Sequence, residues 1–302
     1  MNKYAKRIKI IVHGINEHPL AKRHKLRAYF NFLRWQIRCI VNNKEKKTRF
    51  TDKTFLVIKK GMAGATGNIY LGLHEFNDMG FLLHFLNNED LFIDIGANIG
   101  SYAILAAGHV GANVIAIEPI PSTFLSLQKN IQVNNLQNKI TALEAGVGVE
   151  EGILRFTLNL DTVNHVASQF KEEMIANTIE VRMVTIDGIL KDKKKPSMIK
   201  IDVEGFETEV LNGMQNTLQD QELKAIIIEL NGSGGRYGYD ENLIHQKFLS
   251  LGFNAYRYDP FKRSITQIDN FGKHNTIYIR DLNFVTKRIS VSEEIKMFSE
   301  RF

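Results

Sequence analysis

Apolar and polar positions alternate in blocks from residue 89 onward, with short apolar runs separated by amphipathic stretches, and this pattern predicts an α/β fold. The apolar runs are nearly continuous, which is typical of strands buried on both faces, so we expect a mostly parallel sheet. Its seven expected strands lie at 91–95, 113–118, 140–145, 197–202, 225–230, 253–258 and 275–280. Helices are expected between most of them, at 100–109, 121–135, 206–218 and 240–251.

The segment between the third and fourth of these strands has a different pattern. Residues 152–158 and 179–185 alternate between apolar and polar positions, as antiparallel strands at a sheet edge do. The polar stretch DTVNHVASQF between them is expected to be a surface loop. We therefore predict an insertion at about 151–186, where α/β enzymes usually build substrate specificity.

The chain before residue 89 predicts an appendage and the start of the main domain. Residues 1–50 favour helix, 54–60 favour a short strand, and the glycines within 61–75 favour a loop lying close to other backbone or to a ligand. The expected division is an N-terminal helical appendage at 1–60 and a domain at 61–302, with its cofactor half at about 89–150.

Composition indicates an ordinary globular protein of 302 residues, 44% hydrophobic and 24% charged. The single cysteine, Cys39, excludes a disulfide within the chain, and nothing indicates an oxidising compartment. Charges interrupt the apolar residues of the first stretch, MNKYAKRIKIIVHG, which argues against a signal peptide, and no apolar run approaches the length of a membrane span. We therefore expect a cytoplasmic protein.

The net charge of +6 is distributed unevenly. Residues 1–60 contain 17 Lys and Arg against 3 Asp and Glu, a net charge of +14, whereas the rest of the chain carries −8. Charge runs usually form solvated helical faces, and this is the interpretation we favour. The alternative is attraction to an anionic partner such as a phospholipid surface, a nucleic acid or a phosphorylated substrate.

Apolar side chains are frequent in residues 28–41, AYFNFLRWQIRCIV, and suit a helix that packs on the rest of the protein. A helix that lies in a membrane interface has the same pattern. The sequence therefore leaves peripheral membrane contact through the basic segment open.

The stretch LFIDIGANIGSYAILAAG at 91–108 predicts a strand, a glycine-rich turn and a helix, an arrangement that many folds use to bind a nucleotide. A dinucleotide-binding turn has the spacing G-x-G-x-x-G, whereas here no glycine lies between Gly96 and Gly100, and Asp94 lies inside the strand end. A pyrophosphate needs bare backbone N–H groups, while a cofactor with a cationic amino group and no phosphate favours a nearby carboxylate. The turn therefore indicates S-adenosylmethionine.

Glu118 ends the second strand, where an acidic side chain can accept hydrogen bonds from both hydroxyls of a ribose. Such an acid occurs in nicotinamide enzymes and methyltransferases alike, so it indicates an adenosine ligand without choosing between the two. Each feature also has a structural explanation, since Gly96 and Gly100 could be packing glycines and Glu118 an exposed strand end. Their combination in one unit is what favours cofactor binding.

Three segments, FIDIGANIGSYAILAA, IAIEPIPSTFLSLQKNIQVNN and IKIDVEGFETEVLNGM, resemble the FkbM-type methyltransferases. The resemblance covers about residues 60–282, and IDVEGFE at 201–207 is its most specific part. It implies a Rossmann-like methyltransferase fold and an S-adenosylmethionine-dependent O-methyltransferase that acts on sugars or polyketide-type hydroxyls. It also implies which residues hold the cofactor: Glu118 at the ribose, and at the methionine side Asp94, Gly96, Asn98 and Gly100.

Methyl transfer to an alcohol requires alignment of the hydroxyl and removal of its proton, so a base or a metal ion is useful. The candidate catalytic residues are three acids at the ends of the fourth and fifth strands and one histidine in the insertion loop: Asp202, Glu204, Glu229 and His165. Converging carboxylates could bind Mg²⁺, or they could raise one another's pKa so that one acts as a general base near neutral pH. We favour the base and expect no metal site, because the motif contains no His or Asn to complete a ligand set.

We expect the protein to methylate a carbohydrate hydroxyl, on a free sugar, a nucleotide sugar or a glycan. The block GMAGATGNIYLGLHEFNDM at 61–79 is similar to a subgroup associated with bacterial surface-polysaccharide genes, so polysaccharide biosynthesis is the expected setting. No nucleic-acid partner is expected, because the basic residues are remote in sequence from the cofactor motifs and no RNA-binding signature is present. The sequence leaves a homo-oligomer open.

Two alternatives remain. One is an NAD(P)-dependent oxidoreductase, against which the missing middle glycine argues. The other is a non-catalytic scaffold of the same fold that docks on a membrane or on glycosyltransferases through the basic segment. The presence of Asp94, Glu118 and Asp202 argues against a non-catalytic scaffold, because such a protein would not need these acids.

Overall fold

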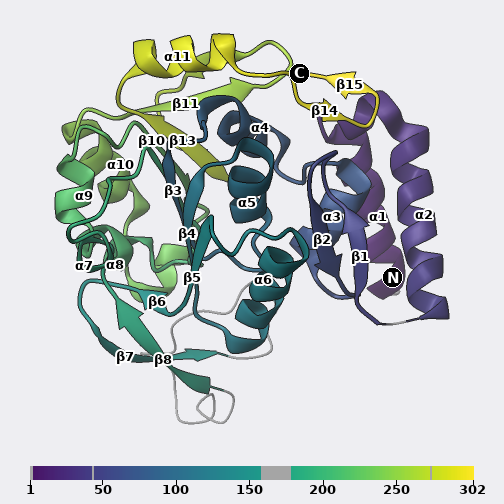
Figure 1. Ribbon diagram of the computed structural model, residues 1–302, viewed down its shortest axis with the longest axis horizontal. Coiled ribbons are helices and arrows are strands. Elements are labelled where there is room, and N and C mark those ends of the chain that lie inside the picture. The colour runs from purple at the N-terminus through teal and green to yellow at the C-terminus, as the bar shows by residue number, and fades with distance from the viewer. Residues whose placement is uncertain (1–2, 43, 158–177, 273) are drawn as a thin grey trace.

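The central feature is an eight-stranded sheet, seen in a computed structural model that describes residues 3–42, 44–157, 178–272 and 274–302 (Figure 1). Across the sheet the strands run in the order β12 (Ser264–Gln267), β11 (Asn254–Asp259), β13 (Asn275–Ile279), β10 (Ala225–Glu229), β9 (Met198–Ile201), β3 (Leu91–Ile95), β4 (Asn113–Glu118) and β5 (Ile140–Glu144). The five strands from β10 to β5 are parallel, and β13 is antiparallel to both of its neighbours. The predicted α/β fold with a mostly parallel sheet is therefore confirmed.

All seven predicted strands lie in this sheet, and an eighth, β12, was not predicted. Residues Ser264–Gln267 pair with β11 at the outer edge, and every residue of β12 is at least partly exposed. An edge strand of this kind has no buried apolar run, so the apolar pattern gave no signal for it.

Helices cover both faces of the sheet, in layers that Figure 1 shows to either side of the central strands. On one face lie α4 (Phe76–Phe85), α5 (Ser101–Ile104), its π-helical continuation η2 (Leu105–Val110) and α6 (Pro121–Val133). On the other lie α8 (Glu207–Asn212), α9 (Gln215–Gln219) and α10 (Glu241–Ser250). Side chains of β3 alternate between the two cores, with Phe92 in the first and Ile93 in the second.

The helix predicted over 206–218 is broken in two by Gly213. A Cβ atom at Gly213 would lie 1.9 Å from the carbonyl oxygen of Gly148, so the backbone of the neighbouring loop occupies the side-chain position. The helix α11 (Leu282–Val291) and the short α7 (Ile186–Ile189) complete the layers, and neither was predicted.

The glycine-rich segment 61–75 is not the loop that the sequence predicts, because most of it forms helix α3 (Ala63–Leu71). Its small residues let the helix pack closely: a Cβ atom at Gly67 would lie 2.4 Å from the His74 ring. Helix propensity is a weak preference that such packing overrides. Gly72, with φ of 86°, then ends the helix.

The N-terminal segment contains two long helices and a hairpin. Helices α1 (Lys3–Glu17) and α2 (Lys25–Val41) are joined by a 3₁₀ turn, η1 (Ala21–His24), and are followed by an antiparallel pair, β1 (Lys46–Arg49) and β2 (Phe55–Ile58). The helical prediction for 1–50 is therefore wrong for β1, whose charged residues pair with the apolar strand β2. No helix in the described ranges combines the length and the hydropathy that a bilayer crossing needs.

The insertion between β5 and β9 begins as a small separate sheet. In it β8 (Thr178–Val184) lies between β6 (Gly146–Val147) and β7 (Gly152–Thr157), antiparallel to β7 as predicted. The predicted surface loop that joins β7 to β8 falls at 158–177, outside the described residues, and so does His165.

Candidate active site

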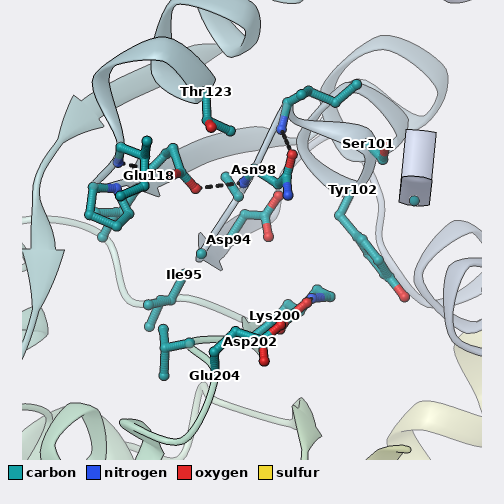
Figure 2. Close-up of a pocket in the computed structure, with 18 of the residues that line it drawn as sticks. Asp94, Ile95, Asn98, Ser101, Tyr102, Glu118, Thr123, Lys200, Asp202 and Glu204 are labelled. Carbon is teal, nitrogen blue, oxygen red and sulfur yellow. Dashed lines mark hydrogen bonds and ion pairs between the residues drawn. The ribbon is translucent and has the colours of Figure 1, made fainter. Parts of the chain in front are cut away.

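A cavity of about 430 Å³ opens at the carboxyl ends of β3, β4, β9 and β10 (Figure 2). The chain leaves β3 toward β4 and β5 on one side and returns later to β9 and β10 on the other, so β3 and β9 flank the point at which the strand order reverses. Open α/β sheets bind ligands at this point, because the loops diverge there and leave a crevice.

The turn after β3 forms one wall of this cavity, and its glycines are required by the backbone. Gly96 has φ of 77°, and a Cβ atom there would lie 1.8 Å from the Asp202 carbonyl oxygen. Gly100 has φ of 89°, begins α5, and has the Leu127 side chain 2.5 Å from the position of its missing Cβ. These contacts account for both glycines without a cofactor, and they hold the turn against the end of β9 at Gly96 and against α6 at Gly100.

Asp94, inside the end of β3, is buried with its carboxylate toward the cavity. One oxygen, Oδ2, accepts a hydrogen bond of 3.1 Å from the Ala103 backbone N–H, while Oδ1 makes no hydrogen bond to a described residue. Burial raises the pKa of Asp94 to about 6, although Lys200 and the Ala103 N–H act in the opposite direction. A cation bound at Oδ1 would lower this pKa again and keep the group ionised.

Glu118, at the end of β4, is also buried and holds the turn after β3 in place. Its two oxygens accept backbone hydrogen bonds from Asn98 at 2.9 Å and from Ile120 at 3.0 Å (Figure 2). Asn98 is in the left-handed region, with φ of 51°, which aims its N–H at Glu118. Burial raises the pKa of Glu118 to about 7, against the effect of the two N–H donors.

Lys200 is a site residue that the sequence analysis missed. Its side chain is 3% exposed, and its Nζ donates to Oδ2 of Asp202 at 2.8 Å, with the Tyr102 ring 4.9 Å away. Burial alone would lower the pKa of Lys200, but the carboxylates of Asp202, Glu75 and Asp94 outweigh it and raise the pKa well above its usual range. A lysine inside the apolar strand MIKI was the signal that could have found it.

The predicted catalytic acids are brought together by the structure. Asp202, Glu204 and Glu229 each place a carboxylate oxygen within 4.8 Å of the others. Burial, then the charges of Asp202 and Glu229, raise the pKa of Glu204 to about 7. Burial and Asp202 raise that of Glu229 to about 6. Glu204 is thus close to its midpoint of titration at neutral pH, and Glu229 reaches its own at about pH 6.

The opposite wall of the cavity comes from α3 to α5 and includes Glu75, which is linked to polar groups behind the wall, Asp78 and Asn275, that were not predicted. Asn275 donates from Nδ2 to Glu75 at 2.8 Å and to Asp78 at 3.3 Å. Burial and the adjacent Glu75 raise the pKa of Asp78 to about 8. The buried Tyr102 hydroxyl makes no hydrogen bond within the described part of the chain, and burial, followed by Glu75, raises its pKa. It therefore remains a hydrogen-bond donor.

Helix α3 is tied to this site through one side chain. Asn68 donates from Nδ2 to Ser101 Oγ at 3.2 Å and accepts from the His74 backbone N–H at 2.7 Å. Both Asn68 and His74 line the cavity. The glycine-rich segment therefore does lie beside the site, as predicted, although it does so as a helix.

The model of the Methyltransferase FkbM domain family matches residues 94–255, just over half of the chain. A hexuronic acid methyltransferase, AglP, from Haloferax volcanii is 30% identical over 152 residues, which are 50% of this chain and 59% of that protein. A protein named Methyltransferase 1 from Beauveria bassiana is 25% identical over 185 residues, 54% of this chain and 74% of that protein.

Among solved structures, precorrin-6y C5,15-methyltransferase from Geobacter metallireducens GS-15 is similar with a TM-score of 0.39 and 14% identity. The match covers 68% of this chain and 88% of that one.

Proposed function

The chain belongs to the FkbM methyltransferase family, and from this premise we propose that it transfers a methyl group from S-adenosylmethionine to a hydroxyl of a sugar or glycan. One observation carries the proposal. Two buried carboxylates, Asp94 and Glu118, end adjacent parallel strands and line one cavity, and each retains capacity to accept further hydrogen bonds.

The cavity fits this cofactor in charge and in hydrogen-bonding capacity. Each Glu118 oxygen already accepts one N–H, and a carboxylate offers about four acceptor positions, so one position per oxygen remains for a ribose hydroxyl. Asp94 Oδ1 would accept from the amino group of the methionine part. Among the described residues that line the cavity, carboxylates outnumber the one lysine or arginine, Lys200, which favours a positively charged ligand.

When bound, S-adenosylmethionine supplies a methyl group on a positively charged sulfur, which is already activated for displacement. The protein must then orient the acceptor hydroxyl and take its proton. Glu204 and Glu229 suit the second task, since their pKa values of about 7 and about 6 allow either to accept a proton near neutral pH. Asp202 is paired with Lys200, so it is the anchor of the cluster in our proposal rather than the base.

The same three acids could in principle hold a metal ion. Lys200 argues against that use, because its ammonium group lies 2.8 Å from Asp202 and neutralises the carboxylate that a dication would need. We therefore retain proton transfer to a carboxylate, without Mg²⁺, as the proposed mechanism.

The sugar acceptor is proposed from the relative that is named a hexuronic acid methyltransferase. The chain matches 59% of the length of that relative. The family description names methyl transfer, which favours it over the oxidoreductase alternative.

The test of cofactor binding is calorimetry of S-adenosylmethionine with the wild type and with Glu118→Gln and Asp94→Asn. Because a hydrogen bond to a charged group contributes about 1.5–3 kcal/mol, each variant is expected to bind at least about tenfold more weakly. The matched control is Glu144→Gln, since Glu144 pairs with Glu118 in register at the end of β5 but is exposed and outside the cavity. Absence of binding heat with the wild type, or an equal loss in the control, would refute the proposed cofactor site.

The test of the acceptor is methyl transfer to a pool of uronic-acid glycans and nucleotide sugars. Glu204→Gln and Glu229→Gln are expected to lower kcat while leaving the cofactor Kd within about twofold, because neither side chain contacts the proposed ribose or amino subsites. Methylation of none of these acceptors by a protein that does bind the cofactor would overturn the sugar assignment alone.

A further inference from the structure

The outer face of α2 carries a continuous row of exposed apolar side chains, which we name the apolar stripe. Its members are Leu26 (89% exposed), Phe30 (62%), Leu33 (57%), Ile37 (60%), Ile40 (80%) and Val41 (80%). Leu26, Phe30, Leu33, Ile37 and Ile40 follow one another at intervals of three or four residues, and Val41 adjoins the last of them, so all lie on one side of the helix. Scattered single apolar residues are normal on a protein surface, but a contiguous row of this kind marks an interaction site.

The stripe is not part of the protein's own core. The opposite face of α2 contains Ala28, Trp35 and Cys39, which are buried in the main hydrophobic cluster. In Figure 1, α2 is the outermost element on its side of the molecule, with α1 and α3 between it and the sheet. One face of α2 is therefore packed on the core, while the opposite face is apolar and yet exposed to solvent. This exposed apolar face needs an explanation.

A basic hollow of about 470 Å³ adjoins the stripe, between α2, β1 and the C-terminal segment. Six of its lining residues are cationic, and none of the six forms an ion pair with a described residue: Arg27, Arg34, Arg38, Lys47, Arg49 and Lys296. Asp52 is the one acidic residue among its lining residues. Arg27 and Lys47 lie over the rings of Phe298 and Phe55. Cations that are gathered around one hollow without a carboxylate partner are suited to bind anionic groups such as phosphates.

The charge of the whole chain points the same way. Residues 1–60 carry +14 and the remainder −8, so an anionic surface would attract the molecule with α2 foremost and repel its other side. A second copy of this chain is a poor occupant of the stripe, because dimerisation through α2 would bring two strongly basic segments together.

We propose that α2 docks the protein on an anionic phospholipid membrane. The apolar stripe enters the boundary between headgroups and acyl chains, and the cations of the basic hollow bind lipid phosphates beside it. The helix lies in the plane of the interface, because one of its faces packs on the protein and the apolar stripe on the other face runs along its length. The basic hollow shares the lining residue Asn68 with the cavity of the proposed methyl transfer, but the inference rests on the exposed face of α2 and stands independently of the proposed function.

The experiment is co-sedimentation of the full chain with vesicles of phosphatidylcholine alone and with vesicles containing equal amounts of phosphatidylcholine and phosphatidylglycerol. Binding is expected to the anionic vesicles and to weaken as salt is added, because surface charges are screened. Failure to bind anionic vesicles, or equal binding to both kinds, would overturn the proposal.

Two pairs of substitutions at exposed positions separate the apolar and the charged contributions. Arg34→Gln with Arg38→Gln is expected to weaken binding about 25-fold, since each basic residue near an anionic surface contributes about 1 kcal/mol. Phe30→Ser with Ile37→Ser is expected to weaken it at least about tenfold by removing the inserted side chains.

Each pair has a matched control away from α2. Leu243 and Ile153 are 62% and 68% exposed, so Leu243→Ser with Ile153→Ser removes similar apolar area without touching the stripe. Lys191→Gln with Lys193→Gln removes two exposed charges elsewhere. Controls that weaken binding as much as the α2 pairs, or a Phe30 and Ile37 pair that dissociates a dimer while vesicle binding is unchanged, would contradict membrane docking.

Discussion

At the scale of single residues, the site depends on buried carboxylates whose hydrogen bonds and nearby positive charge do not fully offset the cost of burying a negative charge. Glu118 and Asp94 each have a pKa raised by burial, to about 7 and about 6, although backbone N–H groups and Lys200 act against the rise. Both groups are therefore partly protonated near neutral pH in the free protein. A ligand that donates hydrogen bonds or carries positive charge would convert them to the ionised form.

Cofactor affinity is accordingly expected to rise with pH between 5.5 and 7.5. S-adenosylmethionine binds the ionised carboxylates, and Glu118, with a pKa of about 7, is mostly protonated at the lower pH, so the affinity should increase about 25-fold through Glu118 alone. Calorimetry at the two pH values measures this. In Glu118→Gln the increase should shrink to the smaller part due to Asp94; an unchanged pH dependence in that variant would show that Glu118 is not the titrating group.

The same pKa values predict the sign of a stability change in the free protein. The folded pKa of Glu118 lies above its ordinary value of 4.5, so the native state binds more protons than the unfolded state between these values. The contribution of Glu118 to stability is therefore complete below about pH 4.5 and declines as the pH rises through about 7.

At the scale of elements, the turn between β3 and α5 is determined by contact with the end of β9. Gly96 has φ of 77°, and the carbonyl oxygen of Asp202 occupies the position where a side chain would start. Because that oxygen belongs to the backbone, it cannot rotate away as a flexible side chain could. The turn, the acid cluster after β9 and the cavity wall are thus one rigid unit.

Gly96→Ala is expected to lower the free energy of unfolding by about 3 kcal/mol or more, because both the positive φ and the contact at 1.8 Å must be relieved. Urea denaturation measures the change. The matched control is Gly152→Ala in β7, where a Cβ atom would meet nothing within 4 Å, and there the effect should stay below about 1 kcal/mol. Equal stability of Gly96→Ala and the wild type would show that the turn is not held as described.

At the scale of the whole molecule, the N-terminal helices share the core of the sheet domain. Ile15, Leu20 and Trp35 belong to the same buried cluster as Phe92 of β3 and Leu127 of α6. Asn130 adds a polar link, since it accepts from Val57 N–H in β2 at 2.6 Å and donates to the Ile99 carbonyl in the cofactor turn at 2.8 Å. The predicted division at residue 60 therefore stays a prediction that an unfolding experiment can decide.

A single unfolding transition is expected for the two parts. Trp35 is the one tryptophan, is buried in α2 and reports on the N-terminal segment by fluorescence, whereas far-UV circular dichroism reports on the whole chain. Because the segment and the sheet share one core, both signals should change at the same urea concentration. A fluorescence midpoint clearly below the circular dichroism midpoint would show instead that the N-terminal segment unfolds as a separate domain.

The sequence alone determined the elements whose pattern is local. The near-continuous apolar runs placed all seven predicted strands, and the parallel order implied by the helices between them put Asp94, Glu118, Asp202 and Glu229 at one edge of the sheet. The strand positions and the parallel order together bring these acids close to one another, since the carboxyl ends of parallel strands meet on one side of the sheet. For that reason the cavity and most of its acids could be predicted without coordinates.

Only the tertiary structure decided features that depend on residues distant in the chain. The pairing of Lys200 with Asp202 beside Asp94, the hydrogen bond from Asn275 to Glu75, and the helical form of the glycine-rich segment all arise from contacts between elements. The exposure of the α2 stripe belongs here too, because a local pattern shows that a helix has apolar residues but not which of them the core covers. Periodicity is set by neighbours along the chain, whereas burial and charge pairing are set by neighbours in space.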